Sequence, residues 1–329
     1  MEPREMVNQL NQVARGFQHS QILFTALRND VFSLLRTAAV PAEIAAARDW
    51  PERGARMLLD GLVAIGLVEN MGTGAYRNTE TAELCLVPGA PHDQRHILEH
   101  LSHSYDSFAR LDESVRTGGP VKSESEGRTE EELTAFIHGM ADLTKTTAPA
   151  VVSALDLTRC THLLDVGAGP AAYSVAFLEA YPNLHATILD MPQVIPIAQE
   201  RVEKAGLTDR CQFIAGDLTQ DPFGDGYDIV FLSNIIHSFD SMQNRAIVKK
   251  SFDALEPGGR LIVKDFLLEP GRTGPAFGLV FAINMLLHTP AGDTYTQDEV
   301  ASWCSEAGFT KGELIALGYA SRMWVASKG

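Results

Sequence analysis

The 329-residue sequence contains few cysteines, and they lie far apart. They form neither a CxxC pair nor the Cys/His spacing of a zinc site. The four are Cys85, Cys160, Cys211 and Cys304. We therefore expect free, mostly buried thiols in a reducing compartment, and no cysteine-bound metal.

Long apolar runs are also missing. The longest, residues 276–287, contains Asn284 and is shorter than the ~20 residues that a helix needs to cross a bilayer. The first residues, MEPREMVNQLNQ, carry charges and lack the apolar segment of a signal peptide. We expect a soluble cytoplasmic protein without a membrane partner.

Positive charge is scarce in this chain. Lysine and arginine total 27 against 42 aspartate and glutamate residues, so the formal net charge at pH 7 is −15. Nucleic acids and anionic membranes would repel such a protein, so neither is an expected partner.

The N-terminal part, residues 1–93, predicts a winged-helix-like domain. Apolar residues recur at helical spacing over 7–36, further helices begin at Pro41 and Pro51, and two strands around a glycine-rich turn follow over 67–79. DNA-binding winged helices need a basic face. The first 88 residues contain eight arginines and no lysine against ten acidic residues, which disfavours a DNA-binding regulator.

Residues 94–155 predict a helical connector, with helices at about 94–118 and 130–154. The pattern then changes. Residues 162–190, HLLDVGAGPAAYSVAFLEAYPNLHATILD, predict a strand, a glycine turn, a helix and a second strand that ends at Asp190. In such a βαβ unit the glycines let a ligand approach the backbone at a helix N-terminus.

Strands and helices continue to alternate through residues 156–329, which form the third predicted segment. The expected strands are 163–167, 186–190, 211–215, 227–232 and 259–267, with helices between them and an antiparallel hairpin at the C-terminus. The predicted fold class is therefore α/β: a Rossmann-like doubly wound parallel sheet with an antiparallel edge hairpin, preceded by the mostly helical N-terminal domain.

The glycine turn by itself leaves the ligand open, because Gly167, Gly169 and Ala172 also fit a dinucleotide pattern. Asp165 favours another ligand, since a carboxylate two residues before the first glycine would repel a pyrophosphate and attract a cation. S-adenosylmethionine carries a sulfonium and an ammonium and no phosphate. It is the expected cofactor, and a nicotinamide-dependent oxidoreductase is the alternative.

Three downstream blocks make this expectation specific: AGDLTQDPF, GYDIVFLSNIIHSFD and LEPGGRLIVKD. With them, nearly the whole chain resembles the S-adenosylmethionine-dependent O-methyltransferase family of plant caffeate and flavonoid enzymes and their bacterial relatives in secondary metabolism. The resemblance implies a small-molecule methyl acceptor and a homodimer formed through the N-terminal domain. One departure is Ala171, where the family usually has a third glycine.

The resemblance assigns cofactor contacts around the glycine turn. Gly167 would lie against the methionine part of the cofactor, Asp165 and Gly169 would shape the turn, and Asp190 would bind the ribose hydroxyls. For each aspartate, the alternative is a helix cap or a turn residue.

Further cofactor contacts follow from the downstream blocks. Asp217 would receive the adenine amino group, and Leu218 would cover the ring. Ser233 would lie at the amino-acid end of the cofactor, where plant members have lysine, so its contact is open.

The resemblance also indicates catalytic residues. His237 matches the family's general base, and imidazole has an unperturbed pKa of ~6.5, which suits proton transfer near neutral pH. Asp265 matches the first of two acids that bracket this histidine. Thr294 falls at the position of the second, with Asp293 one residue earlier. Either Asp293 substitutes, or the acceptor is acidic enough without it, or the reaction is methylation of carbon or nitrogen.

The acceptor pocket is expected along the helix at 276–288, where four residues share one face: Phe277, Phe281, Asn284 and His288. Two aromatic rings, an amide and an imidazole suit a flat acceptor with a polar edge. The resemblance adds Phe136 and Met140 from the 130–154 helix. No metal is predicted, although His237 and His288 could converge on one, as in relatives that C-methylate α-keto acids.

Overall fold

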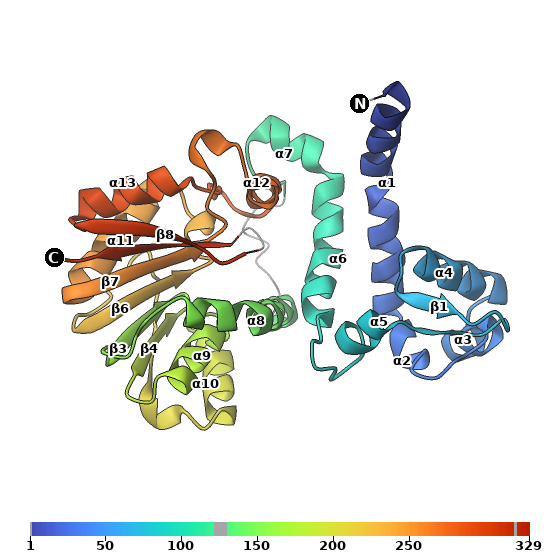
Figure 1. The fold of residues 1–329 in the computed structure, drawn as a ribbon, viewed down its shortest axis with the longest axis horizontal. Coiled ribbons are helices and arrows are strands. Elements are labelled where there is room, and N and C mark those ends of the chain that lie inside the picture. The colour runs from blue at the N-terminus through green and yellow to red at the C-terminus, as the bar shows by residue number, and fades with distance from the viewer. Residues whose placement is uncertain (1, 122–129, 319–320) are drawn as a thin grey trace. The chain divides into compact units, whose positions relative to one another are not determined.

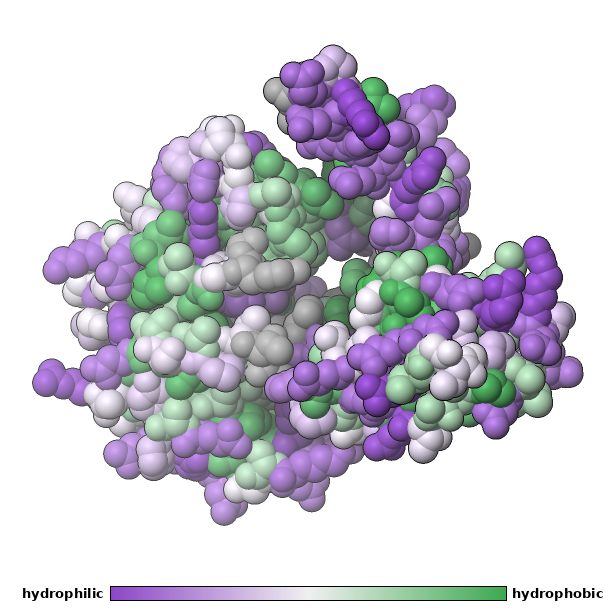
Figure 2. Space-filling view, turned by 45° about the vertical axis from the view of Figure 1, so that its right-hand side comes forward, coloured by the Kyte–Doolittle hydropathy of each residue, from purple (hydrophilic) through white to green (hydrophobic). Residues whose placement is uncertain are grey.

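The computed structural model describes residues 2–121, 130–318 and 321–329. It separates into two compact units, Met1–Tyr105 and Asp106–Gly329. Within the described ranges, no helix has both the length and the hydrophobicity needed to cross a bilayer. On the face shown in Figure 2, hydrophilic and hydrophobic residues are interspersed.

The first unit is mostly helical and carries one small hairpin. Its elements are α1 (Pro3–Arg28), α2 (Val31–Leu34), α3 (Pro41–Arg48), α4 (Glu52–Ala64), β1 (Val68–Asn70), β2 (Tyr76–Asn78), α5 (Glu80–Cys85) and most of α6 (Arg95–Ala109). Asp30 adopts a left-handed conformation, φ 48°, and separates α1 from α2. The helical pattern over 7–36 therefore forms two helices. Phe32, Leu59 and Leu62 lie in the core of this unit.

The second unit contains a seven-stranded sheet with helices on both faces. Its elements are α7 (Leu111–Thr117), α8 (Glu130–Ser153), β3 (His162–Val166), α9 (Ala172–Ala180), β4 (His185–Asp190), α10 (Ile195–Lys204), η1 (Thr208–Arg210), β5 (Cys211–Ala215), β6 (Tyr227–Ser233), η2 (Ile236–Ser238), α11 (Ser241–Ala254), β7 (Leu255–Asp265), η3 (Pro270–Arg272), α12 (Ala276–His288), α13 (Gln297–Ala307), β8 (Lys311–Ala316) and β9 (Arg322–Ser327).

The strand order is β5-β4-β3-β6-β7-β9-β8 (Figure 1). The first five strands are parallel, and β9 and β8 form an antiparallel hairpin at one edge. Successive residues of β3 face opposite layers: Leu163 packs with residues of α8, α9 and α10, and Leu164 packs with residues of α11 and α13. The predicted fold class is confirmed.

Two local predictions were wrong. No helix joins β5 to β6, because the connection over 216–226 contains Pro222 and two glycines with positive φ, Gly224 and Gly226. The helix expected over 94–118 is interrupted at Arg110, so that α6 and α7 are separate. The helix predicted at 276–288 is α12, with the same bounds.

The topology fixes where a ligand can bind. From β3 the chain adds β4 and β5 on one side, and it then crosses to add β6 and β7 on the other. The strand order thus reverses between β3 and β6, and ligands of such sheets bind beyond the carboxyl ends of the strands at this switch point. The glycine turn follows β3 there, and Ser233 ends β6.

Candidate active site

The glycine turn joins β3 to α9 through three residues with positive φ: Gly167, Gly169 and Ala171, at 67°, 56° and 55°. A Cβ at Gly167 would collide with the side chain of Ile235 and would lie 3.6 Å from Leu218. The turn therefore lies against apolar side chains from two other loops. Ile235 was not predicted as a site residue, although it lies within the apolar run before His237.

Asp190 ties the end of β4 to this turn. Its Oδ2 accepts a hydrogen bond from the Gly169 amide at 2.7 Å, and its Oδ1 accepts one from the Met191 amide at 2.7 Å. The side chain is buried, and burial raises its pKa despite these two bonds. Asp190 thus lies beside the glycine turn, at the carboxyl edge of the sheet.

Asp165 differs from the expectation. Its carboxylate is buried and accepts a hydrogen bond from the Ser174 hydroxyl at 2.6 Å. Burial raises the pKa of Asp165 to about 7, against the opposing effect of that bond. Charged and neutral forms therefore coexist at neutral pH, and the carboxylate faces α9. The electrostatic reason for preferring a cationic ligand assumed a full negative charge at this position, and burial of Asp165 weakens that reason.

The loop after β5 carries Asp217 and Leu218. Asp217 is exposed, and its Oδ1 accepts hydrogen bonds from the amide and the hydroxyl of Thr219, both at 2.7 Å. These bonds lower its pKa. This is the turn geometry considered as the alternative for Asp217. The Nζ of Lys250 donates to the carbonyls of Leu218 at 2.5 Å and Asp221 at 2.8 Å, which fastens the loop to α11.

His237 lies on η2 and is buried, with its Nδ1 2.9 Å from Oδ1 and 3.2 Å from Oδ2 of Asp265. Burial alone would raise the pKa of Asp265. The adjacent imidazole and the Phe266 amide outweigh burial, so the pKa falls below its usual value. An ionised Asp265 favours the tautomer with the proton on Nδ1, which leaves the Nε2 lone pair of His237 free for another group.

Two residues that were not predicted hold the η2 loop. The Asn244 amide donates to the carbonyls of Ile236 at 2.8 Å and Phe239 at 3.1 Å, and the Tyr295 hydroxyl donates to Phe239. Asn244 is fully buried on α11. Both contacts join segments that are separate in sequence, so no local pattern could have revealed them.

Aromatic rings from β7 and α12 surround the imidazole. The Phe281 ring stands edge-on to His237 with ring centroids 4.9 Å apart, and Phe266 stacks on it at 6.3 Å. Phe277 packs against Phe266 at 4.8 Å. The predicted aromatic face of α12 is therefore next to His237.

The remaining predicted acceptor residues lie on α12 and α8. The Nδ1 of His288 lies 2.9 Å from the backbone carbonyl of Asn284. Met140 is half-buried on α8, and the side chain of Phe136 lies outside the described residues. No group of three or more potential metal ligands occurs within the described part of the chain.

The loop after α12 does not supply a second acid. Thr294 is buried, and its hydroxyl donates to the Gly278 carbonyl at 3.1 Å. Asp293 accepts a bond from Arg272 at 2.7 Å, and both side chains are about 40% exposed. The option that Asp293 substitutes for the missing acid therefore has no support in this geometry, because its carboxylate is paired with Arg272.

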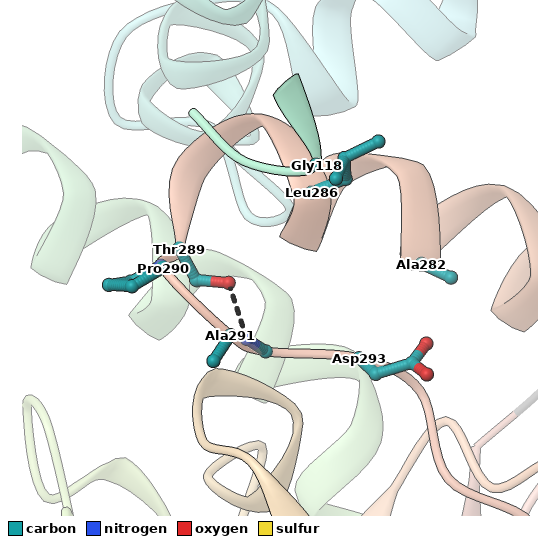
Figure 3. Close-up of a pocket in the computed structure, with 8 residues that line it drawn as sticks. Gly118, Ala282, Leu286, Thr289, Pro290, Ala291 and Asp293 are labelled. Atoms are coloured by element: carbon teal, nitrogen blue, oxygen red, sulfur yellow. Dashed lines mark hydrogen bonds between the residues drawn. The ribbon is translucent and has the colours of Figure 1, made fainter. Parts of the chain in front are cut away.

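A cavity of about 360 Å³ lies beside this loop. Figure 3 shows that α12 contributes Ala282 and Leu286, and that the loop is held by the bond from the Gly292 amide to the Thr289 hydroxyl. None of the predicted acceptor residues lines this cavity.

Comparison with known proteins identifies two family matches. Residues 112–310 match an O-methyltransferase domain, and residues 11–88 match an O-methyltransferase dimerisation domain. The chain is 32% identical over 309 residues to 3-hydroxy-5-methyl-1-naphthoate 3-O-methyltransferase of Streptomyces sahachiroi, covering 91% of this chain and 88% of that protein. It is 31% identical over 308 residues to the tetracenomycin polyketide synthesis 8-O-methyltransferase of Streptomyces glaucescens, covering 91% and 90%.

Among solved structures, human N-acetylserotonin methyltransferase in complex with S-adenosylmethionine is similar over the whole chain. The TM-score is 0.90 at 26% sequence identity, and the alignment covers 100% of this chain and 99% of that chain.

Proposed function

We propose that this chain, which belongs to the plant-type family of S-adenosylmethionine-dependent O-methyltransferases, methylates an aromatic hydroxyl and uses His237 as its general base. Family membership makes S-adenosylmethionine the methyl donor and the oxygen of a small molecule the acceptor atom. It decides against the nicotinamide oxidoreductase and against transfer to carbon or nitrogen. The aromatic class of the acceptor, the base and the dimer are the proposal.

The residues at the switch point fit the donor. Gly167 has a positive φ, and a Cβ there would collide with the Ile235 side chain. A buried hydroxyl at Ser233 has no partner among the described residues. Gly167, Asp190, Asp217, Leu218 and Ser233 would hold the donor. When bound, it supplies an electrophilic methyl group on a sulfonium.

The observation that carries the proposal is the buried contact between His237 and Asp265. With Nδ1 occupied, Nε2 of His237 would accept the proton of the acceptor hydroxyl as that oxygen takes the methyl group, and the C–S bond of the donor's sulfonium would break to leave a neutral thioether. Asp265 stabilises the imidazolium that results. General-base catalysis of this kind contributes about 10²–10⁴-fold in rate, and alignment of the acceptor supplies much of the remainder.

The aromatic class of the acceptor rests on the rings around the imidazole. Phe266, Phe277 and Phe281 form a continuous cluster with His237, which suits a flat ring whose hydroxyl reaches Nε2. The names of the two Streptomyces relatives, a naphthoate and a polyketide methyltransferase, point to the same class.

A homodimer is proposed from the N-terminal unit. Helix α1 exposes Val7, Leu10, Val13 and Phe17, which are 52–77% accessible and recur at helical spacing. An exposed apolar stripe of this kind is typical of a protein–protein interface. The match of residues 11–88 to a dimerisation domain makes a second copy of this chain the expected partner.

The test of the base compares His237→Ala and His237→Gln with the unchanged protein. We expect turnover of a panel of phenols and naphthols to fall by about 10²-fold or more, while calorimetric binding of S-adenosylhomocysteine stays within a few-fold. An Ala variant that retains full turnover would remove His237 from the mechanism. If the panel contains no acceptor for the unchanged protein, the aromatic class is wrong.

A further inference from the structure

Lys264 is a buried lysine that the proposed mechanism does not use. It is the penultimate residue of β7 and is 3% exposed. Its Nζ donates to the side-chain oxygen of Asn234 at 3.0 Å and lies 5.4 Å and 5.9 Å from the ring centroids of Tyr173 and Phe266. Among the described residues it forms no ion pair, and this one hydrogen bond uses one of the three N–H groups of the ammonium.

A second unused donor lies beside it. Ser233 and Lys264 are paired residues of the parallel strands β6 and β7. The backbones of neighbouring strands are about 4.8 Å apart, and paired residues extend to the same face. The hydroxyl of Ser233 is buried and has no hydrogen-bond partner among the described residues. Two adjacent groups that can donate to an anion therefore lie together at the carboxyl end of the sheet.

This pair lies on the α9 side of the sheet, close to the glycine turn. Tyr173, which covers Lys264, is in the first turn of α9, directly after the glycine turn. Ser233 ends the strand that borders β3 at the switch point. The charge of Lys264 interacts with the carboxylate of Asp265, but no hydrogen bond joins the two groups. A ligand anion that accepts hydrogen bonds from the ammonium would recover part of its lost solvation.

S-adenosylmethionine carries one anionic group, the α-carboxylate of its methionyl end. The carboxylate that binds the glycine turn, that of Asp190, would repel the α-carboxylate. We propose that Lys264, together with Ser233, forms the subsite that binds the α-carboxylate of S-adenosylmethionine. This rests on the family's use of that donor, and it is independent of the base and of the acceptor.

The experiment compares two ligands that differ only in this carboxylate, S-adenosylmethionine and decarboxylated S-adenosylmethionine. Their binding is measured by calorimetry on the full-length protein without a methyl acceptor. A charge-assisted hydrogen bond corresponds to roughly 10- to 100-fold in affinity. We expect the unchanged protein to prefer S-adenosylmethionine by about this factor.

Replacing Lys264 should abolish that preference. In Lys264→Met, S-adenosylmethionine should bind roughly 10- to 100-fold more weakly, and the decarboxylated ligand should bind as tightly as before or more tightly. Lys264→Arg should retain most of the preference. The matched control is Lys249→Met, an exposed lysine of α11 paired with Asp253, which should change neither affinity.

Three results would overturn the proposal. The first is equal binding of the two ligands to the unchanged protein. The second is an equal loss of both affinities in Lys264→Met, which would show that the lysine only supports the fold around Asn234. The third is no loss at all. Should Lys264→Met fail to fold, Ser233→Ala decides instead, because it removes one buried hydroxyl and should weaken only the carboxylate-bearing ligand.

Discussion

The contact between His237 and Asp265 permits a quantitative test of what the carboxylate does. Asp265→Asn keeps the shape of the side chain, and the amide oxygen can still accept the Nδ1 proton of His237. The charge is lost, and one carboxylate oxygen is replaced by an NH2 group that donates instead of accepting. Hydrogen bonds to charged groups contribute about 1.5–3 kcal/mol and neutral ones about 0.5–1.5 kcal/mol. The difference, about 1–1.5 kcal/mol, corresponds to roughly a tenfold loss of kcat.

This magnitude separates orientation from proton transfer. If Asp265 orients the imidazole and stabilises its cation, Asp265→Asn should cost about tenfold, clearly less than the 10²-fold or more expected for His237→Ala. The assay measures kcat and KM for one phenolic acceptor at saturating donor between pH 6 and 9. Asp253→Asn, an exposed carboxylate of α11, is the matched control. Unchanged kcat in Asp265→Asn would refute the role given to the carboxylate.

The same substitution has a predictable effect on stability. The pKa of Asp265 is below its usual value in the folded protein, because His237 and the Phe266 amide outweigh burial. A lowered folded-state pKa adds stability that is complete above the unfolded value of about 3.9 and is lost as the pH falls through the folded value. Urea unfolding should therefore show a constant deficit of Asp265→Asn from pH 7 to 5, and the deficit should shrink as the pH approaches 4.

Three further predictions concern other parts of the chain. Asp165 has a raised pKa, so its ionisation destabilises the fold as the pH rises from about 4 to 7. Asp165→Asn should therefore gain stability relative to the unchanged protein over that interval. A difference in unfolding free energy that does not vary with pH would contradict this. Ala171→Gly should change the free energy of unfolding by less than about 0.5 kcal/mol, since relief of the left-handed conformation offsets lost burial, whereas Ala198→Gly in α10 should cost about 1 kcal/mol or more. Light scattering should show a dimer that Leu10→Asp converts to monomer. Met242→Asp, which changes an exposed side chain of α11, should leave the dimer intact.

The elements that the sequence predicted well are those whose own pattern determines them. The βαβ unit and α12 are mostly apolar segments bounded by glycines and prolines, so their local sequence is enough to predict them. The connection over 216–226 was assigned a helix from the expected alternation, although Pro222 and its flanking glycines argue otherwise. The expected alternation of strands and helices was given more weight than the proline and glycines, which disfavour a helix in this connection.

In the candidate site, too, some residues could be predicted from motifs and others could not. His237 and Asp265 were identified through motifs, and the structure places them in contact. Asn244 lies outside the quoted sequence blocks, and Lys264 lies within LEPGGRLIVKD without an assigned role there. Their contacts arise only because folding brings Asn244 beside the η2 loop and Lys264 beside Asn234, which follows β6. The burial of Asp165 against Ser174 likewise depends on how α9 packs on β3, which no spacing in the sequence reveals.

With Asp165 buried, the preference for a cationic donor over a dinucleotide needs another physical basis, and the backbone of the glycine turn provides one. Phosphate binding at a helix N-terminus depends on free amide N–H groups. Here the Gly167 amide donates to the Leu189 carbonyl, the Ala171 amide donates to the Ala168 carbonyl, and Pro170 has no amide hydrogen.

The remaining glycine amide, that of Gly169, donates to the carboxylate of Asp190. Both glycine amides of the turn are therefore engaged, and one of them already binds a carboxylate, which would repel a diphosphate. Asp190→Asn tests this reasoning, because it removes the negative charge from the turn. The preference for S-adenosylhomocysteine over NAD should narrow in that variant and should stay unchanged in Asp165→Asn, whereas the reverse result would return the discrimination to Asp165.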